Sequence, residues 1–152
     1  MQINEYTSVT EEQTNLTFGF IKVLFEEDVN EYWSLISKVD KARVLGMYKI
    51  AKDLKEGISF HDYVKYEFMY PQREIYEKVK ENSGLASHLR YTDEGEPVVY
   101  LLENITEPIV YEEATQVKVF PVTLTLDTEV NNNEIITIWK VRLYFDKEYE
   151  IL

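Results

Sequence analysis

The residues best suited to acid–base chemistry in this chain of 152 residues are its two histidines, His61 and His88. His88 is the stronger candidate because Arg90 follows two residues later, on the same face of an expected strand. Such a pair can bind or polarise an anionic group. If the protein is an enzyme, we expect His88 to be the general base and Arg90, or a tyrosine hydroxyl, to stabilise the developing negative charge.

A simpler interpretation of this strand is that His88 and Arg90 face solvent while Leu89 and Tyr91 pack inward. Exposed polar residues are common on the outer face of an antiparallel strand. His61 and Asp62 do not offer a second dyad, because neighbouring residues of a helix point about 100° apart. We therefore expect no catalytic residue, and catalysis by His88 is the alternative.

Metal and cofactor chemistry have little support in the sequence. The chain has no cysteine, which excludes disulfides, thiolate metal sites and a thiol nucleophile. No metalloprotease or calcium-loop motif is present, and the five glycines are isolated, so no phosphate-binding loop is visible. We expect neither a metal nor a cofactor.

Length and composition predict one soluble domain over residues 1–152, with 45% hydrophobic residues. The net charge of −12 repels phosphate backbones and anionic lipid surfaces, so we expect no nucleic-acid or membrane partner. The first residues lack the pattern of a signal peptide, and no apolar run approaches the roughly 20 residues of a membrane helix. These features predict a cytoplasmic protein.

The first part of the chain, about 14–82, has helical periodicity. We expect a helix over residues 14–25, a second capped by Asp28, and a third from about residue 40 that ends before Gly57. Apolar residues of the third helix share one stripe: Val44, Met47, Tyr48, Ala51 and Leu54. Ser59 is expected to cap a helix that runs to residue 70, and Pro71 to begin another over 72–81 with Ile75, Tyr76 and Val79 inward.

From about residue 86 to 151 the pattern changes to strands. We expect one hairpin from 87–92 and 98–103, and a longer one from 111–128 and 134–150, joined through three asparagines at 131–133. In both long strands, the apolar residues expected to point inward switch between odd-numbered and even-numbered positions. After the switch in the first of these strands, the inward residues are Val122, Leu124 and Leu126. Such a change indicates a bulge or a sharp bend. We therefore predict an α+β fold in which helices pack on the concave face of a strongly curved antiparallel sheet.

Two segments resemble a known family. Residues 18–37, FGFIKVLFEEDVNEYWSLIS, are similar to the opening of the nuclear transport factor 2-like superfamily, also called the ketosteroid-isomerase-like or cystatin-like cone. Residues 138–151, IWKVRLYFDKEYEI, resemble its closing strand. The resemblance implies a cone-shaped domain with a pocket at its open end. Members of this family include isomerases, dehydratases, hydrolases and pocketed domains without activity.

Two hypotheses for the function follow. The first is a non-enzymatic binding domain that holds a small hydrophobic or anionic ligand, or a protein partner, and forms a homodimer through the exposed sheet. The ligand-binding residues that we expect are Trp33, Tyr63, His88, Arg90 and Trp139, although any one aromatic can equally be part of the core. The alternative is an isomerase, dehydratase or hydrolase that acts in the same pocket.

Overall fold

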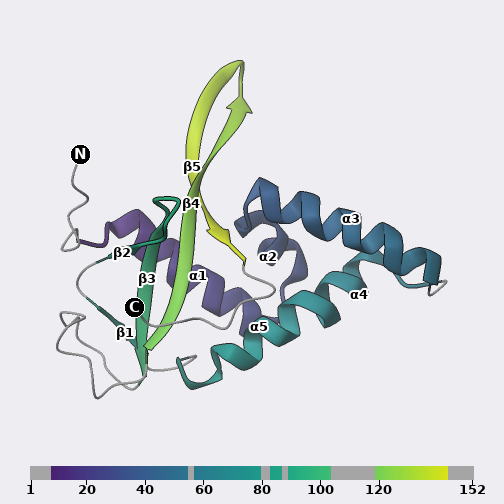
Figure 1. The fold of residues 1–152 in the computed structure, drawn as a ribbon, viewed down its shortest axis with the longest axis horizontal. Coiled ribbons are helices and arrows are strands. Elements are labelled where there is room, and N and C mark those ends of the chain that lie inside the picture. The colour runs from purple at the N-terminus through teal and green to yellow at the C-terminus, as the bar shows by residue number, and fades with distance from the viewer. Residues whose placement is uncertain (1–7, 55–56, 80–82, 87–88, 104–118, 144–152) are drawn as a thin grey trace.

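The computed structural model describes residues 8–54, 57–79, 83–86, 89–103 and 119–143 (Figure 1). The helical elements are Glu11–Glu26 (α1), Val29–Leu35 (α2), Lys38–Leu54 (α3), Phe60–Val64 (α4), the π-helical turn Lys65–Met69 (η1), Tyr70–Ile75 (α5) and the 3₁₀ turn Glu77–Val79 (η2). The strands are Ser83–Leu85 (β1), Arg90–Tyr91 (β2), Pro97–Glu103 (β3), Val119–Asn131 (β4) and Glu134–Arg142 (β5).

Side-chain caps set where three of the helices begin. Thr10 and Gln13 form a reciprocal capping box, which starts α1 a few residues before the predicted position. The predicted cap of α2 is confirmed, because Asp28 Oδ1 accepts a hydrogen bond of 3.1 Å from the backbone N–H of Glu31. The predicted cap of α4 is confirmed too, since Ser59 Oγ accepts one of 3.1 Å from Asp62. Gly57, beyond α3, has the left-handed φ of 87° that its position predicted.

Pro71 lies in the first turn of a new helix, α5, as predicted. The chain passes from α4 through η1 into α5 without leaving helical geometry. In η1 the N–H of Tyr70 bonds to the carbonyl of Lys65, five residues back. This wider turn accommodates the missing N–H of the proline. The following helix ends at Ile75 rather than at residue 81. Tyr76 and Val79 are buried as predicted, whereas Ile75 is 38% exposed instead of inward.

The strands form one antiparallel sheet in the order β1-β3-β4-β5, and β2 also pairs with β3. Both predicted hairpins are present within the described residues. The long one, β4–β5, turns through Asn132 and Asn133, whose φ angles of 51° and 66° are left-handed. The strongly curved sheet forms a half-barrel with helices packed against it, which confirms the predicted α+β fold.

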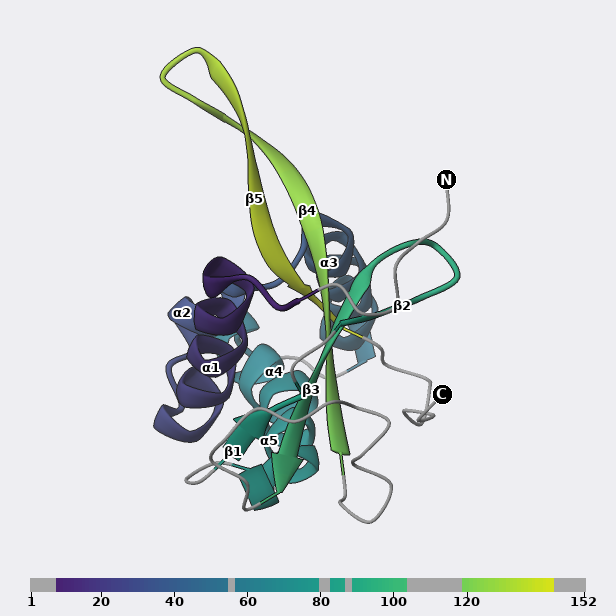
Figure 2. The same ribbon diagram turned by 90° about the vertical axis from the view of Figure 1, so that its left-hand side faces the viewer.

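The curvature of the long hairpin arises without a bulge between residues 123 and 142. Pairing runs without an extra residue from Val119–Leu102 to Thr123–Val98 and from Thr123–Arg142 to Asn131–Glu134, so the predicted bulge is absent from both strands over these residues. Val122 and Leu124 are buried as predicted, but Leu126 is 52% exposed. The prediction for Leu126 was wrong because the far half of the hairpin extends beyond the helices, as both views show (Figures 1 and 2).

The core lies between α1 and the sheet, with α2 and α5 beside α1. Phe20 and Leu24 of α1 are fully buried there. In α3 only part of the predicted stripe is buried: Val44 is 1% exposed, whereas Met47 is 42% and Leu54 84% exposed. Among the described residues, no helix has the length and apolar character needed to cross a membrane.

Candidate functional site

The most buried charged group in the described chain is Asp40, in the first turn of α3, with 0% exposure. Its Oδ2 accepts hydrogen bonds from Ser37 Oγ at 2.6 Å and from the backbone N–H of Leu143 at 2.8 Å. Its Oδ1 forms an ion pair with the guanidinium of Arg142. These contacts attach the start of α3 to the end of β5.

The backbone supports the same junction. Ser37 N–H donates to the carbonyl of Val141 at 2.9 Å, and Ile36 forms a parallel bridge with Val141. Ser37 Oγ also accepts from the N–H of Asp40 at 3.2 Å, as a helix cap does. This site was not predicted from the sequence, although Ser37 and Asp40 have the spacing of a capping box. The partner Arg142 lies over a hundred residues away, so no local sequence pattern predicts its contact with Asp40.

Burial raises the pKa of the Asp40 carboxyl above its ordinary value of 3.8. The hydrogen bonds from Ser37 and Leu143 and the positive charges of Arg142 and Arg43 act in the opposite direction. Because the side chain is enclosed on all sides, no substrate reaches it. We therefore assign Asp40 a structural role.

The raised pKa of Asp40 predicts how its contribution to stability depends on pH. The folded carboxyl holds a proton more tightly than the unfolded one, so protonation favours the folded state. The free energy of unfolding of the wild type, relative to Asp40→Asn, should rise as the pH falls from about 7 to about 4. Urea unfolding of both proteins across this range measures the difference. A difference that decreases with falling pH would contradict the raised pKa.

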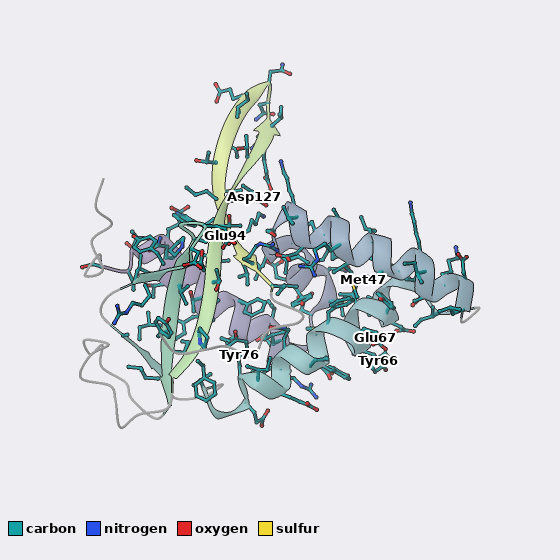
Figure 3. All side chains as sticks on the ribbon, in the orientation of Figure 1. Met47, Tyr66, Glu67, Tyr76, Glu94 and Asp127 are labelled. Carbon is teal, nitrogen blue, oxygen red and sulfur yellow. The ribbon has the colours of Figure 1, made fainter. Side chains whose placement is uncertain are left out.

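The β4–β5 hairpin has two unlike faces. One face carries Asp127, Glu129 and Lys140, and these side chains contact α2, the start of α3 and one another (Figure 3 labels Asp127). Asp127 Oδ2 accepts from the N–H of Lys38 at 2.8 Å. Lys140, which is 9% exposed, donates to the carbonyl of Ser34 at 2.7 Å and lies 3.6 Å from Glu129. These contacts attach the hairpin to α2 and to the start of α3.

The opposite face of the hairpin is uncharged. Residues directly paired in an antiparallel ladder share a face. Beyond the buried pair Leu124–Val141, three successive pairs form this one: Leu126–Trp139, Thr128–Thr137 and Val130–Ile135. Val130 is 76% and Ile135 75% exposed, and both threonines are exposed as well. We call these six residues the uncharged hairpin face. Exposed apolar side chains gathered on one face of a strand pair are typical of an interaction surface.

Two of the predicted ligand-binding residues lie in one run of aromatic rings. Trp33 packs edge-on against Phe60 with ring centroids 5.0 Å apart, and Phe60 against Tyr48 at 5.1 Å. Tyr48 contacts Tyr63 at 5.4 Å, and Tyr63 contacts Phe68 at 5.5 Å. Each ring in this run is packed against another ring. The run joins α2, α3, α4 and η1, so we assign Trp33 and Tyr63 to packing in the free protein.

The other predicted site residues lie elsewhere. Trp139 is half-buried in β5, opposite Leu126, and thus on the uncharged hairpin face. Arg90 is half-buried in β2, opposite Val98. His88 falls outside the described residues, so its pairing with Arg90 stays a prediction. Leu89, predicted to pack inward, is 2% exposed.

A surface cluster joins the end of α1 to α5. Glu27, predicted as part of a solvated acidic joint, accepts hydrogen bonds at Oε1 from Tyr70 Oη at 2.6 Å and from Arg73 at 2.9 Å. The hydrogen bond from Tyr70, with that from Arg73 and nearby positive charge, lowers the pKa of Glu27. No local sequence pattern indicates this contact, because Tyr70 and Arg73 each lie more than 40 residues from Glu27 along the chain.

Within the described ranges, no three histidine, aspartate or glutamate residues are grouped so that they could hold a metal ion. No family model, curated protein or solved structure matches this chain.

Proposed function

We propose that this protein is a non-catalytic interaction domain that associates with a second copy of itself through the uncharged hairpin face. One observation carries the proposal: every charged residue of the hairpin between 123 and 142 lies on the other face. The uncharged face presents Leu126, Val130 and Ile135 to solvent at 52%, 76% and 75% exposure. Burying these side chains against a partner would be favourable.

A second copy suits this surface because of the charge of the chain. At a net charge of −12, two copies repel each other wherever their acidic surfaces meet. The uncharged hairpin face allows them to approach without burying a carboxylate. In a two-fold dimer the same surface occurs on both sides, and pairs of threonine, valine and isoleucine pack well on each other.

The position of β5 gives further support. It is the last strand in the sheet order, so along much of its length one edge has no neighbouring strand among the described elements. An exposed edge next to an apolar face readily pairs with another chain. The half-barrel sheet also supports the proposal that the chain is a nuclear transport factor 2-like domain.

Sedimentation velocity with matched charge insertions tests the proposal. We expect the wild type to sediment as a dimer at micromolar concentration and Ile135→Glu to be a monomer, because a buried glutamate would destabilise the interface. The matched control is Ile50→Glu on α3, whose side chain is 65% exposed against 75% for Ile135, and it should remain a dimer. A monomeric wild type, or an Ile135→Glu variant that dimerises like the wild type, would overturn the proposal.

A further inference from the structure

The outer edge of β5 has no neighbour over much of its length in the described chain. β5 is the last strand in the sheet order. Near its end the carbonyl of Val141 accepts a hydrogen bond of 2.9 Å from the N–H of Ser37, so the backbone of Val141 points away from β4. Backbone groups alternate in direction along an antiparallel strand. Those of Ile135, Thr137 and Trp139 therefore point outward too, and among the described residues they have no hydrogen-bond partner.

This edge lacks the devices that usually prevent a strand from pairing with another chain. Such devices are a charged side chain, a proline, a bulge or a covering element. The outward positions are occupied by isoleucine, threonine and tryptophan, and the pairing of β5 with β4 contains no bulge. Figures 1 and 2 show the far half of the hairpin extending beyond the helices. The stretch 135–139 therefore has a free edge within the described part of the chain.

The free edge of β5 is complementary to itself. When two copies of the stretch 135–139 run antiparallel about a two-fold axis at Thr137, Ile135 lies opposite the partner's Trp139 and Thr137 lies opposite its own counterpart. All of these residues have outward backbone groups, so each opposing pair exchanges two hydrogen bonds. An axis one residue nearer the C-terminus would place Ile135 opposite Val141, whose carbonyl is already bonded. An axis one residue nearer the turn would place Trp139 beside the partner's hairpin turn and lose its bonds.

The same register matches charges on the other face of the hairpin. It places Glu134, which is exposed, opposite the partner's Lys140. Directly opposed charges of unlike sign stabilise a strand pair. Lys140 lies 3.6 Å from Glu129 within its own copy, so Glu134 would join an existing ion pair. Because the two-fold axis repeats the contact, a chain of net charge −12 gains an attractive contact on each side of the axis.

We propose that two copies join edge to edge, with β5 antiparallel to the partner's β5 and the two-fold axis at Thr137, so that their sheets form one continuous sheet. This arrangement rests on the proposed function and specifies how the copies meet. Within the uncharged hairpin face, Ile135, Thr137 and Trp139 make the contacts between copies, and Ile135 packs on the partner's Trp139. Face-to-face packing of two hairpins would also satisfy the proposed function, and cysteine cross-linking separates the two arrangements.

Cross-linking at two paired threonines tests the arrangement. Thr128 and Thr137 are directly paired, exposed and on the same face of the hairpin, and the chain has no cysteine of its own. Edge pairing brings the two copies of residue 137 to about 5.5 Å between Cα atoms, which is within disulfide range. It keeps the two copies of residue 128 three strand spacings apart, about 14 Å. Under mild oxidation at micromolar concentration, Thr137→Cys should form a covalent dimer about ten-fold or more faster than Thr128→Cys.

Proline at the same two positions tests the backbone hydrogen bonds between copies. Neither threonine donates its N–H within the β4–β5 ladder, because the backbone groups of this pair point outward, so proline leaves that ladder intact. Thr137→Pro should sediment as a monomer, since it loses the N–H at the axis. Thr128→Pro, on the strand away from the partner, should remain a dimer. Matching far-ultraviolet circular dichroism of the two variants verifies that both are folded.

Edge pairing would be overturned by equal cross-linking rates at residues 128 and 137, which face-to-face packing predicts. It would also be overturned if Thr137→Cys forms no covalent dimer while the wild type sediments as a dimer, or if Thr137→Pro remains a dimer. In each case the proposed function survives when the wild type is a dimer and Ile135→Glu a monomer. A monomeric wild type would overturn both, so the two failures are distinguishable.

Discussion

Replacing Phe20 by alanine should lower the free energy of unfolding by about 4 kcal/mol. Phe20 is fully buried in α1 and stacks on Tyr32, with ring centroids 5.9 Å apart. It also meets Tyr76 edge-on at 6.1 Å. Removing the ring loses its burial and leaves a cavity between two other buried rings. Tyr76 would in addition be held less firmly, although its hydroxyl donates to the carbonyl of Pro121 at 2.7 Å.

Urea unfolding measures the free energy of unfolding lost in Phe20→Ala. The melting temperature should fall by about 10 °C. Phe18→Ala is the matched control, because Phe18 lies on the same helix and is 37% exposed. That substitution should cost much less. Equal losses for the two variants would mean that Phe20 is not at the centre of the core.

Replacing Asp40 by alanine should cost about 3 kcal/mol. The substitution leaves the Leu143 N–H and Ser37 Oγ without their acceptor and removes the carboxylate from the Arg142 guanidinium. The partly buried Arg142 guanidinium would lose its closest anion and keep the longer contact of 3.9 Å between its Nε and Glu96 Oε2, which accounts for part of the loss. The junction between α3 and β5 should loosen, which hydrogen exchange at Leu143 would report.

A double-mutant cycle separates the ion pair from the other contacts of Asp40. Arg142→Met removes the partner charge while keeping an apolar stem of similar length. We expect a coupling energy of at least about 1 kcal/mol between the two substitutions. Asp53→Ala, at the exposed far end of the same helix, should change stability by less than about 0.5 kcal/mol. Additive losses at Asp40 and Arg142 would show that the two side chains do not interact.

Local chemistry made much of the fold predictable. Asp28 and Ser59 cap helices because their oxygens reach backbone N–H groups three residues ahead, a contact that involves no distant part of the chain. Asn132 and Asn133 tolerate left-handed backbone angles, which placed the turn of the long hairpin. The predicted α+β class followed from the change in hydrophobic period between the two halves of the chain.

The errors in the prediction arise where tertiary structure decides burial. Leu126 and Leu54 fit the apolar pattern of their strand and helix, yet both are exposed, because the hairpin and α3 extend past the elements that would cover them. Periodicity shows that residues share a face but not whether anything packs on it. For the same reason the ion pair of Asp40 and Arg142 became visible only in three dimensions.

The central claim, that two copies meet at the uncharged hairpin face, is tested most directly by a distance across the dimer. The chain has no cysteine, so Asn133→Cys at the hairpin turn accepts one spin label per copy. Double electron–electron resonance should give a single defined distance between labels, and Ile135→Glu should abolish it. If the labelled protein gives only the background decay and no defined distance, at a concentration where the wild type is expected to be a dimer, the claim is contradicted.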